Sequence, residues 1–159
     1  VSSDKYAVEY LGCPEKIQIV YRFYANKINL DIIWNGKDAS RLPESIWLSI
    51  NPKVDNPNMW FVEKMGELIS PLQVVKNGGR NLHAIASCIE YLGSEKKIKI
   101  QSLDAPLVAM GERKILRYDN NIDISQTANF NLYNNIWGTN FRMWYDDDTK
   151  FRFTIELSK

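Results

Sequence analysis

The feature that most constrains the fold is a two-residue alternation of apolar and polar side chains, which recurs along most of the chain. It is clearest near the C-terminal end, at Phe151, Phe153, Ile155 and Leu157. Successive side chains of a β-strand point to opposite faces of a sheet, so this spacing is typical of a strand with one buried face. Helical spacing of apolar residues is almost absent. The sequence therefore predicts an all-β protein.

A hairpin with one buried face is predicted over residues 17–34, because alternating segments flank the turn at 25–27. Further strands are expected at 46–50, 59–64, 67–69, 97–100, 106–109, 131–137 and 151–158. Residues 82–92 also fit a helix, but their β-branched residues and flanking glycines favour a strand. Residues 117–129 are polar and predict a long surface loop. Many short strands separated by turns favour an antiparallel β-sandwich that forms a single domain over residues 1–159.

Composition excludes several classes of function. The chain has 159 residues, and 45% of them are hydrophobic, which suits one domain with its own core. A net charge of +1 gives no reason to expect nucleic acid or an anionic membrane as a partner. No apolar run is long enough for a transmembrane helix, so a soluble protein is expected, in the cytoplasm or secreted. Cys13 and Cys88 are expected to be two half-buried thiols, with a single disulfide as the alternative.

The sequence contains no nucleophile motif, phosphate-binding loop, dinucleotide fingerprint or cluster of metal ligands. His83, the single histidine, follows a glycine turn; it is either presented to a sugar or partner, or bonded to backbone as a structural residue. Asp104 precedes Pro106 and either accepts bonds from a sugar or Arg80, or fixes a strand entry through local bonds. The sequence does not resemble a complete enzyme.

Two further segments are candidates for ligand contact. The carboxylates at 146–148 offer oxygen ligands for calcium, although a solvated turn is the stronger interpretation. The segment 134–145 is rich in side-chain amides and aromatic rings. Aromatic faces stack on sugar C–H surfaces and amides satisfy hydroxyl groups, so this composition suits carbohydrate contact. The alternative is that Trp137, Phe141 and Trp144 fill the core while the asparagines satisfy buried backbone.

Segments 40–47, 77–84, 102–107 and 134–145 together resemble the C-terminal region of α-mannosidase-like proteins related to glycoside hydrolase family 38. The Trp-Gly-Thr-Asn-Phe run at 137–141 is the most specific of these matches. The resemblance implies a β-supersandwich of the galactose-mutarotase-like kind. In that family, it follows an N-terminal catalytic domain that uses a divalent metal such as zinc. None of the family's metal ligands or catalytic residues carries over to this sequence.

The resemblance predicts a non-catalytic C-terminal β-sandwich domain whose partners are the N-terminal catalytic domain of the same polypeptide and carbohydrate. The start at Val1, without a methionine, agrees with a piece of a longer hydrolase. Residues expected to contact that domain or its sugar are Asn135, Trp137, Thr139 and Asn140. The alternative is a stand-alone carbohydrate-binding module that uses Trp137, Trp144 and His83. A third possibility is an oligomerisation domain.

Overall fold

The computed structural model describes residues 1–116, 118–119, 121–124, 128–138 and 143–159. Within these residues, it is an all-β sandwich of two antiparallel sheets, with one short helix, α1 (Lys5–Leu11), and one 3-10 turn, η1 (Pro57–Met59). The strands are β1 (Lys16–Phe23), β2 (Lys27–Asn35), β3 (Ser45–Ile50), β4 (Trp60–Lys64), β5 (Glu67–Ile69), β6 (His83–Ala84), β7 (Cys88–Leu92), β8 (Lys97–Ser102), β9 (Leu107–Met110), β10 (Ala128–Asn134) and β11 (Thr149–Ser158). The predicted fold class is confirmed.

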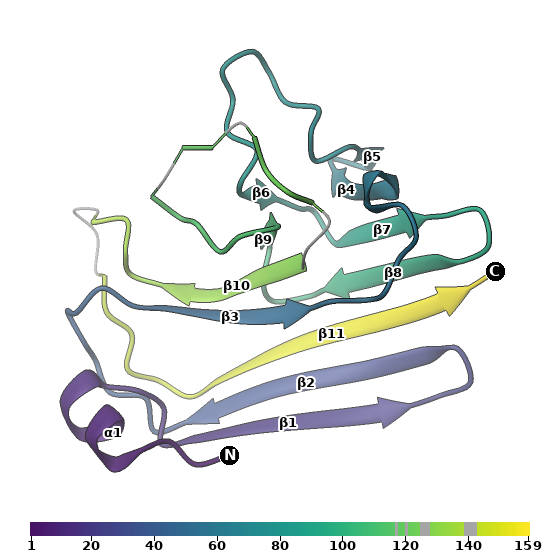
Figure 1. Cartoon of the computed structure of the whole chain (residues 1–159). Coiled ribbons are helices and arrows are strands. Elements are labelled where there is room, and N and C mark those ends of the chain that lie inside the picture. Colours follow the sequence, from purple (N-terminus) through teal and green to yellow (C-terminus); the bar gives the residue numbers. More distant parts are fainter. Residues whose placement is uncertain (117, 120, 125–127, 139–142) are drawn as a thin grey trace.

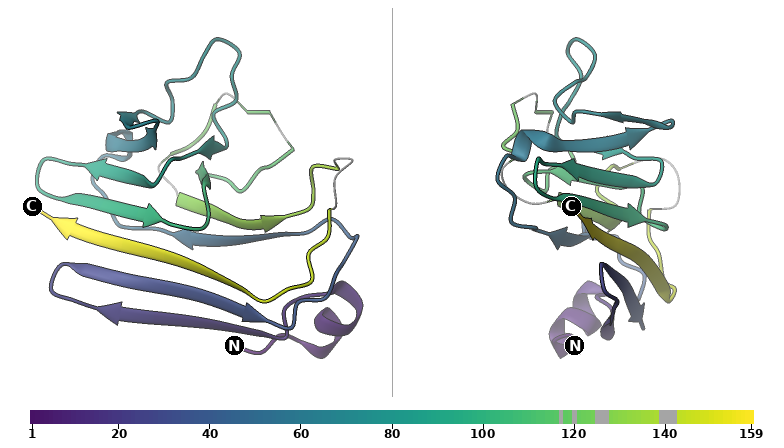
Figure 2. Two further views of the ribbon diagram at one scale, coloured as in Figure 1. Left: turned by 180° about the vertical axis from the view of Figure 1, so that it is seen from behind. Right: turned by 90° about the vertical axis from the view of Figure 1, so that its right-hand side faces the viewer.

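The larger sheet has seven strands in the order β1-β2-β11-β8-β7-β4-β5, and the smaller has four in the order β3-β10-β9-β6. The C-terminal strand β11 lies between β2 and β8, so the first and last parts of the chain share one sheet (Figure 1). Turned views show β3 and β10 in the second layer, with β1 and β2 extending beyond β3 (Figure 2). On one side of the sandwich, therefore, the larger sheet ends at β1 and the smaller sheet ends at β3.

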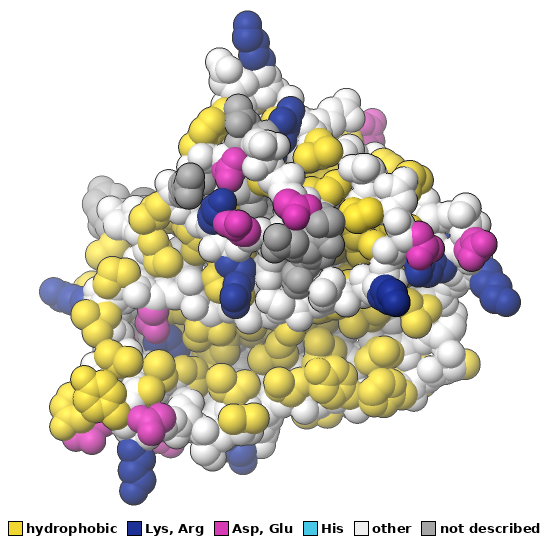
Figure 3. Space-filling view, in the orientation of Figure 1, with side chains coloured by type: hydrophobic (Ala, Val, Ile, Leu, Met, Phe, Trp, Pro, Cys, Tyr) yellow, Lys and Arg dark blue, Asp and Glu magenta, His cyan; other side chains and the backbone are white. Residues whose placement is uncertain are grey.

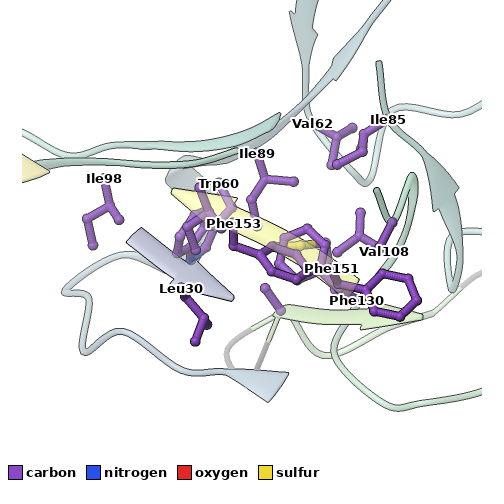
Figure 4. Close-up of a cluster of buried hydrophobic side chains, with 14 of the residues drawn as sticks. Leu30, Trp60, Val62, Ile85, Ile89, Ile98, Val108, Phe130, Phe151 and Phe153 are labelled. Carbon is purple, nitrogen blue, oxygen red and sulfur yellow. The ribbon is translucent and has the colours of Figure 1, made fainter. Parts of the chain in front are cut away.

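The core lies between the two sheets and is built from the alternating residues that predicted the strands. Phe153 of β11 packs edge-on against Phe130 of β10, with ring centroids 5.1 Å apart, and so joins the two layers. Side chains from both sheets converge around this contact (Figure 4). Ile89, Ile100 and Val108 have no exposed surface. Burial of such side chains contributes about 1.5–3 kcal/mol each to folding, which makes this layer the main source of stability.

The predicted hairpin is confirmed, but only β2 has a buried apolar face. Ile19 of β1 pairs with Ile32 of β2, so both side chains lie on the same face of the sheet. Ile32 is 5% exposed, whereas Ile19 is 48% exposed. The prediction of a buried face on β1 was therefore wrong. The alternation specified the strand, but the smaller sheet does not reach far enough to cover it.

Three other sequence predictions need correction. The strand expected over 82–92 is two strands, because β6 belongs to the smaller sheet and β7 to the larger, and the chain crosses between the layers from Ile85 to Ser87. Strand β10 begins at Ala128, so it takes up the end of the loop expected at 117–129. Helix α1 was not predicted. Asp4 caps its first turn through the N–H groups of Tyr6 and Ala7, and Gly12 ends it at φ +68°.

Candidate functional site

A pocket of about 280 Å³ opens where β10 ends, next to the chain that returns to β11. Strand β10 ends toward the left of the molecule in Figure 1. Among the described residues, its lining consists of Tyr133, Asn134, Asn135, Trp137, Gly138, Met143, Trp144 and Tyr145. The volume is at the lower end of the range for small-molecule sites. The segment that the sequence singled out for its amides and rings therefore does form a concave surface.

Aromatic side chains form the walls of this pocket. Trp137 is 48% exposed, so it is not part of the core. The guanidinium carbon of Arg41 lies 4.6 Å from the centroid of the Trp144 ring. This cation–π contact fixes one side of the indole. The rings of Tyr133 and Tyr145 are 6.2 Å apart, and the Tyr145 hydroxyl lies 2.7 Å from Oγ1 of Thr149. Trp144 and Tyr145 are thus held by Arg41 and Thr149, which lie outside the pocket lining, whereas Trp137 remains exposed.

One amide in the lining has an unused acceptor. Nδ2 of Asn134 donates to Oδ1 of Asn131 at 2.8 Å, but Oδ1 of Asn134 is buried and has no hydrogen-bond partner within the described part of the chain. Buried polar atoms in native proteins almost always have a partner, and leaving one unpaired costs about 1–3 kcal/mol. A ligand hydroxyl or amine that reached this oxygen would remove that penalty.

Asn135 supports the pocket by holding the chain at residues 40–44. Its Nδ2 donates to the carbonyls of Ser40 at 3.2 Å and Leu42 at 2.9 Å, and its Oδ1 accepts from the Glu44 N–H at 2.7 Å. Both amide hydrogens are therefore engaged with backbone. The structure gives this predicted contact residue a positioning role, because the chain that it holds also carries Arg41, which packs on Trp144.

An ion pair between a fully buried lysine and a partly buried glutamate lies against the pocket residue Tyr133, and the sequence did not predict it. Nζ of Lys37 lies 2.8 Å from Oε1 of Glu44 and 5.1 Å from the centre of the Tyr133 ring. Burial, together with the nearby Glu44 carboxylate, raises the pKa of Tyr133 to about 12, so its hydroxyl stays protonated. That hydroxyl donates to the Met143 carbonyl at 3.3 Å. Nothing in the local pattern around Lys37 distinguishes it from a surface lysine.

His83 and Asp104 do not line the pocket. His83 is 2% exposed on β6, and its Nε2 lies 3.0 Å from the Arg80 carbonyl. Burial lowers its pKa to about 4, which keeps the ring neutral, and this geometry fits the structural alternative. Asp104 accepts from Nε and Nη2 of Arg152 at 2.9 and 2.7 Å, and from the Arg152 N–H at 2.8 Å. The guanidinium partner is thus Arg152 of β11, and it lowers the pKa of Asp104.

The remaining predicted residues are placed as follows. Thr139 and Asn140 lie outside the described residues. Asp148 accepts from Nδ2 of Asn35 and from the Gly36 N–H, each at 2.9 Å, so it fastens the turn after β2. Cys13 and Cys88 are both free thiols. In the described ranges, no three His, Cys, Asp or Glu side chains converge as metal ligands.

A comparison with protein-family models and with curated proteins finds no match to this chain. The hydrolase resemblance therefore remains a prediction from the sequence. Among the described residues, no helix has the length and apolar character needed to cross a membrane.

Proposed function

We propose that this chain is a non-catalytic β-sandwich domain of an α-mannosidase-like glycoside hydrolase, and that it contacts carbohydrate through the pocket at the end of β10. The observation that carries the proposal is that one pocket is lined by an exposed tryptophan and by an asparagine whose buried amide oxygen has no partner among the described residues. An aromatic face binds the C–H side of a sugar, and an amide oxygen accepts from a hydroxyl group. Trp137 and Asn134 offer these two chemistries in one cavity.

The hydrolytic reaction then belongs to a separate catalytic unit. The single histidine of this chain is buried and bonded to backbone, so it is poorly placed to act as an acid or a base on a bound sugar. In this proposal, any divalent metal such as zinc belongs to the catalytic unit. The domain supports that unit and lines part of its sugar site.

Ligand-observed NMR with mannose-containing oligosaccharides tests the contact, because it detects binding in the millimolar range. We expect saturation transfer from the protein to sugar C–H protons, lost in Trp137→Ala. The matched control is Trp47→Ala, on β3 outside the pocket, where the indole N–H donates to Ser45. Absence of transfer in the unmodified chain, or equal loss in both variants, would contradict the proposal.

The affinity of the isolated chain separates this function from a stand-alone carbohydrate-binding module. A small, open pocket that completes a larger site is expected to bind with a Kd in the millimolar range, about −4 kcal/mol. Micromolar binding by the chain alone would favour the stand-alone module. Hydrolysis of aryl α-mannosides by the isolated chain above background would contradict a non-catalytic role.

A further inference from the structure

The inner face of β1 forms an uncovered apolar stripe, made by Ile19, Tyr21 and Phe23. These side chains are 48%, 54% and 72% exposed. By register they continue the rows of Ile32, Leu30 and Ile28 on β2, so they lie on the core-facing side of the sheet. In the space-filling view, hydrophobic side chains form a band across the lower half of the molecule, in the region of β1 and β2 (Figure 3).

The stripe is exposed because the smaller sheet ends at β3, while the larger sheet continues to β1. Ile46, Leu48 and Ile50 of β3 pack on the core but remain partly exposed. The two layers therefore form a step: the stripe is its floor, and the outer edge of β3 is its wall. We call this surface the β1–β3 step.

Both strands at the step have free backbone edges within the described structure. β3 pairs with β10 on its other side. β1 pairs with β2, and among the residues that the structure describes, its opposite edge is paired only at residues 15–17, by Val1–Ser3. From Gln18 to Phe23 this edge has no proline, and its one charge, Arg22, is paired with Asp31 at 2.9 Å. Natural edge strands usually carry charges or proline that block further pairing, so this edge is open to another strand.

We propose that the β1–β3 step is a dimer interface, occupied by the same step of a second copy of this chain. A two-fold axis along the strands, midway between the layers, places β1 of each copy beside β3 of the other. The two stripes then face each other, and both free edges are covered. A two-fold interface must be self-complementary, and two layers that end at different strands fit a second copy in this way.

The chemistry of the step favours a second copy over a charged partner. The stripe and the inner face of β3 carry no charged side chain, so a partner must offer an uncharged apolar counterpart of similar length. The chain itself provides one. Exposed aromatic residues at these fractions contribute about 100 Å² each, so Tyr21 and Phe23 supply roughly 200 Å² per copy. With Ile19 and the partly exposed β3 side chains added, two copies bury less than about 1,200 Å² in total, which is the size of a weak interface that dissociates on dilution.

Size-exclusion chromatography with light scattering on the whole chain tests the proposal. We expect a mass of twice 18.5 kDa that dissociates on dilution. Tyr21→Lys and Phe23→Lys place a charge on the stripe and are expected to weaken dimerisation at least about tenfold. Gln18→Lys adds the same charge to the opposite face of β1 and is expected to leave the dimer intact.

Thermal melting of each variant checks that it is folded. Because Phe23 is largely exposed, its replacement by lysine is expected to leave the fold intact. A folded chain that stays monomeric at all concentrations would overturn the proposal and leave the step for another protein, such as the catalytic unit. A dimer that persists in both Tyr21→Lys and Phe23→Lys would also overturn it, by placing the interface elsewhere. Either result leaves carbohydrate binding at the β10 pocket untouched, because the pocket shares no residue with the step.

Discussion

The ammonium nitrogen of Lys37 lies 2.8 Å from Oε1 of Glu44, and the lysine side chain has no exposed surface. The same nitrogen donates to the carbonyls of Gly12 at 3.0 Å and Asp38 at 3.3 Å. All three N–H bonds of the ammonium group are therefore used, which is the condition for burying a charge at acceptable cost. This one side chain connects the end of α1 with the β2–β3 connection that supports the pocket.

Lys37→Met is expected to destabilise the fold by about 3–5 kcal/mol, because it leaves a carboxylate and two carbonyls without their donor. The measurement is urea unfolding followed by tryptophan fluorescence. Lys27→Met is the matched control, since Lys27 pairs with Glu156 at 3.5 Å where both side chains are about 40% exposed. We expect a change of at most about 1 kcal/mol there. Equal losses in the two variants would show that Lys37 is not buried as described.

Asp104→Asn is expected to cost about 1 kcal/mol at pH 7, because the bridge to Arg152 is bidentate but half exposed. Arg152 lowers the folded-state pKa of Asp104, so this stability is present above the unfolded pKa of about 3.9 and is lost as the pH falls through the folded value. The difference in unfolding free energy between the two proteins should therefore shrink towards pH 2. A difference that is independent of pH would argue against the ion pair as its cause.

His83 predicts a separate pH dependence. Burial lowers its folded-state pKa to about 4, and the positive charge of Lys64 adds to this effect. Between pH 6.5 and 4 the unfolded chain binds a proton at this residue and the folded chain does not. Stability is therefore full above pH 6.5 and falls by about 3 kcal/mol as the pH drops to 4.

His83→Phe should remove that slope, whatever its effect on stability at pH 7. The measurement is the unfolding free energy of both proteins at pH 7.5, 5.5 and 4.5. The carboxylates with lowered pKa values, such as Asp31, titrate in both proteins and serve as the internal control. An unchanged slope in His83→Phe would mean that the ring is accessible to protons in the folded state.

Sequence reasoning recovered the strands because alternation is a local signal that each strand carries by itself. It missed α1 because its seven residues bury no side chain and so lack an apolar stripe; Asp4 and Gly12, at the two caps, were the available signals. It also could not separate β6 from β7, because the change of layer between them depends on the partners of each strand. Pairing partners are properties of the whole fold.

The candidate site was likewise predicted where its signal is local in the sequence, and missed where residues far apart in the chain meet. Trp137 and Trp144 were found from the density of rings in one segment, and the structure places both in the pocket lining. Lys37 and Glu44 were missed because they come from a segment about 90 residues earlier, which only tertiary packing brings beneath Tyr133. Asp104 was singled out, but its partner on β11 lies 48 residues away in the chain. Long-range polar pairs of this kind leave no spacing to detect.

The two thiols are expected to differ in reactivity. Cys88 is 2% exposed, and burial raises its pKa, so its reactive thiolate form is disfavoured. Cys13 is partly exposed at the end of α1. Under native conditions, a thiol-reactive dye should label Cys13 first, with Cys88 reacting at a comparable rate only in denaturant. Cys13→Ser identifies the fast thiol, and rapid labelling that persists in this variant would contradict the burial of Cys88.

Asn135→Ala is expected to weaken both stability and sugar binding, because Asn135 fixes residues 40–44 and thereby the Arg41 contact with Trp144. Loss of three hydrogen bonds to backbone costs about 3 kcal/mol. Asn135→Asp keeps an acceptor for the Glu44 N–H but cannot donate to Ser40 and Leu42, so an intermediate loss is expected. Asn26→Ala, in the exposed β1–β2 turn, is the control. Saturation-transfer NMR at a temperature where all variants are folded measures binding. Undiminished sugar binding in Asn135→Ala would show that the pocket does not depend on this support.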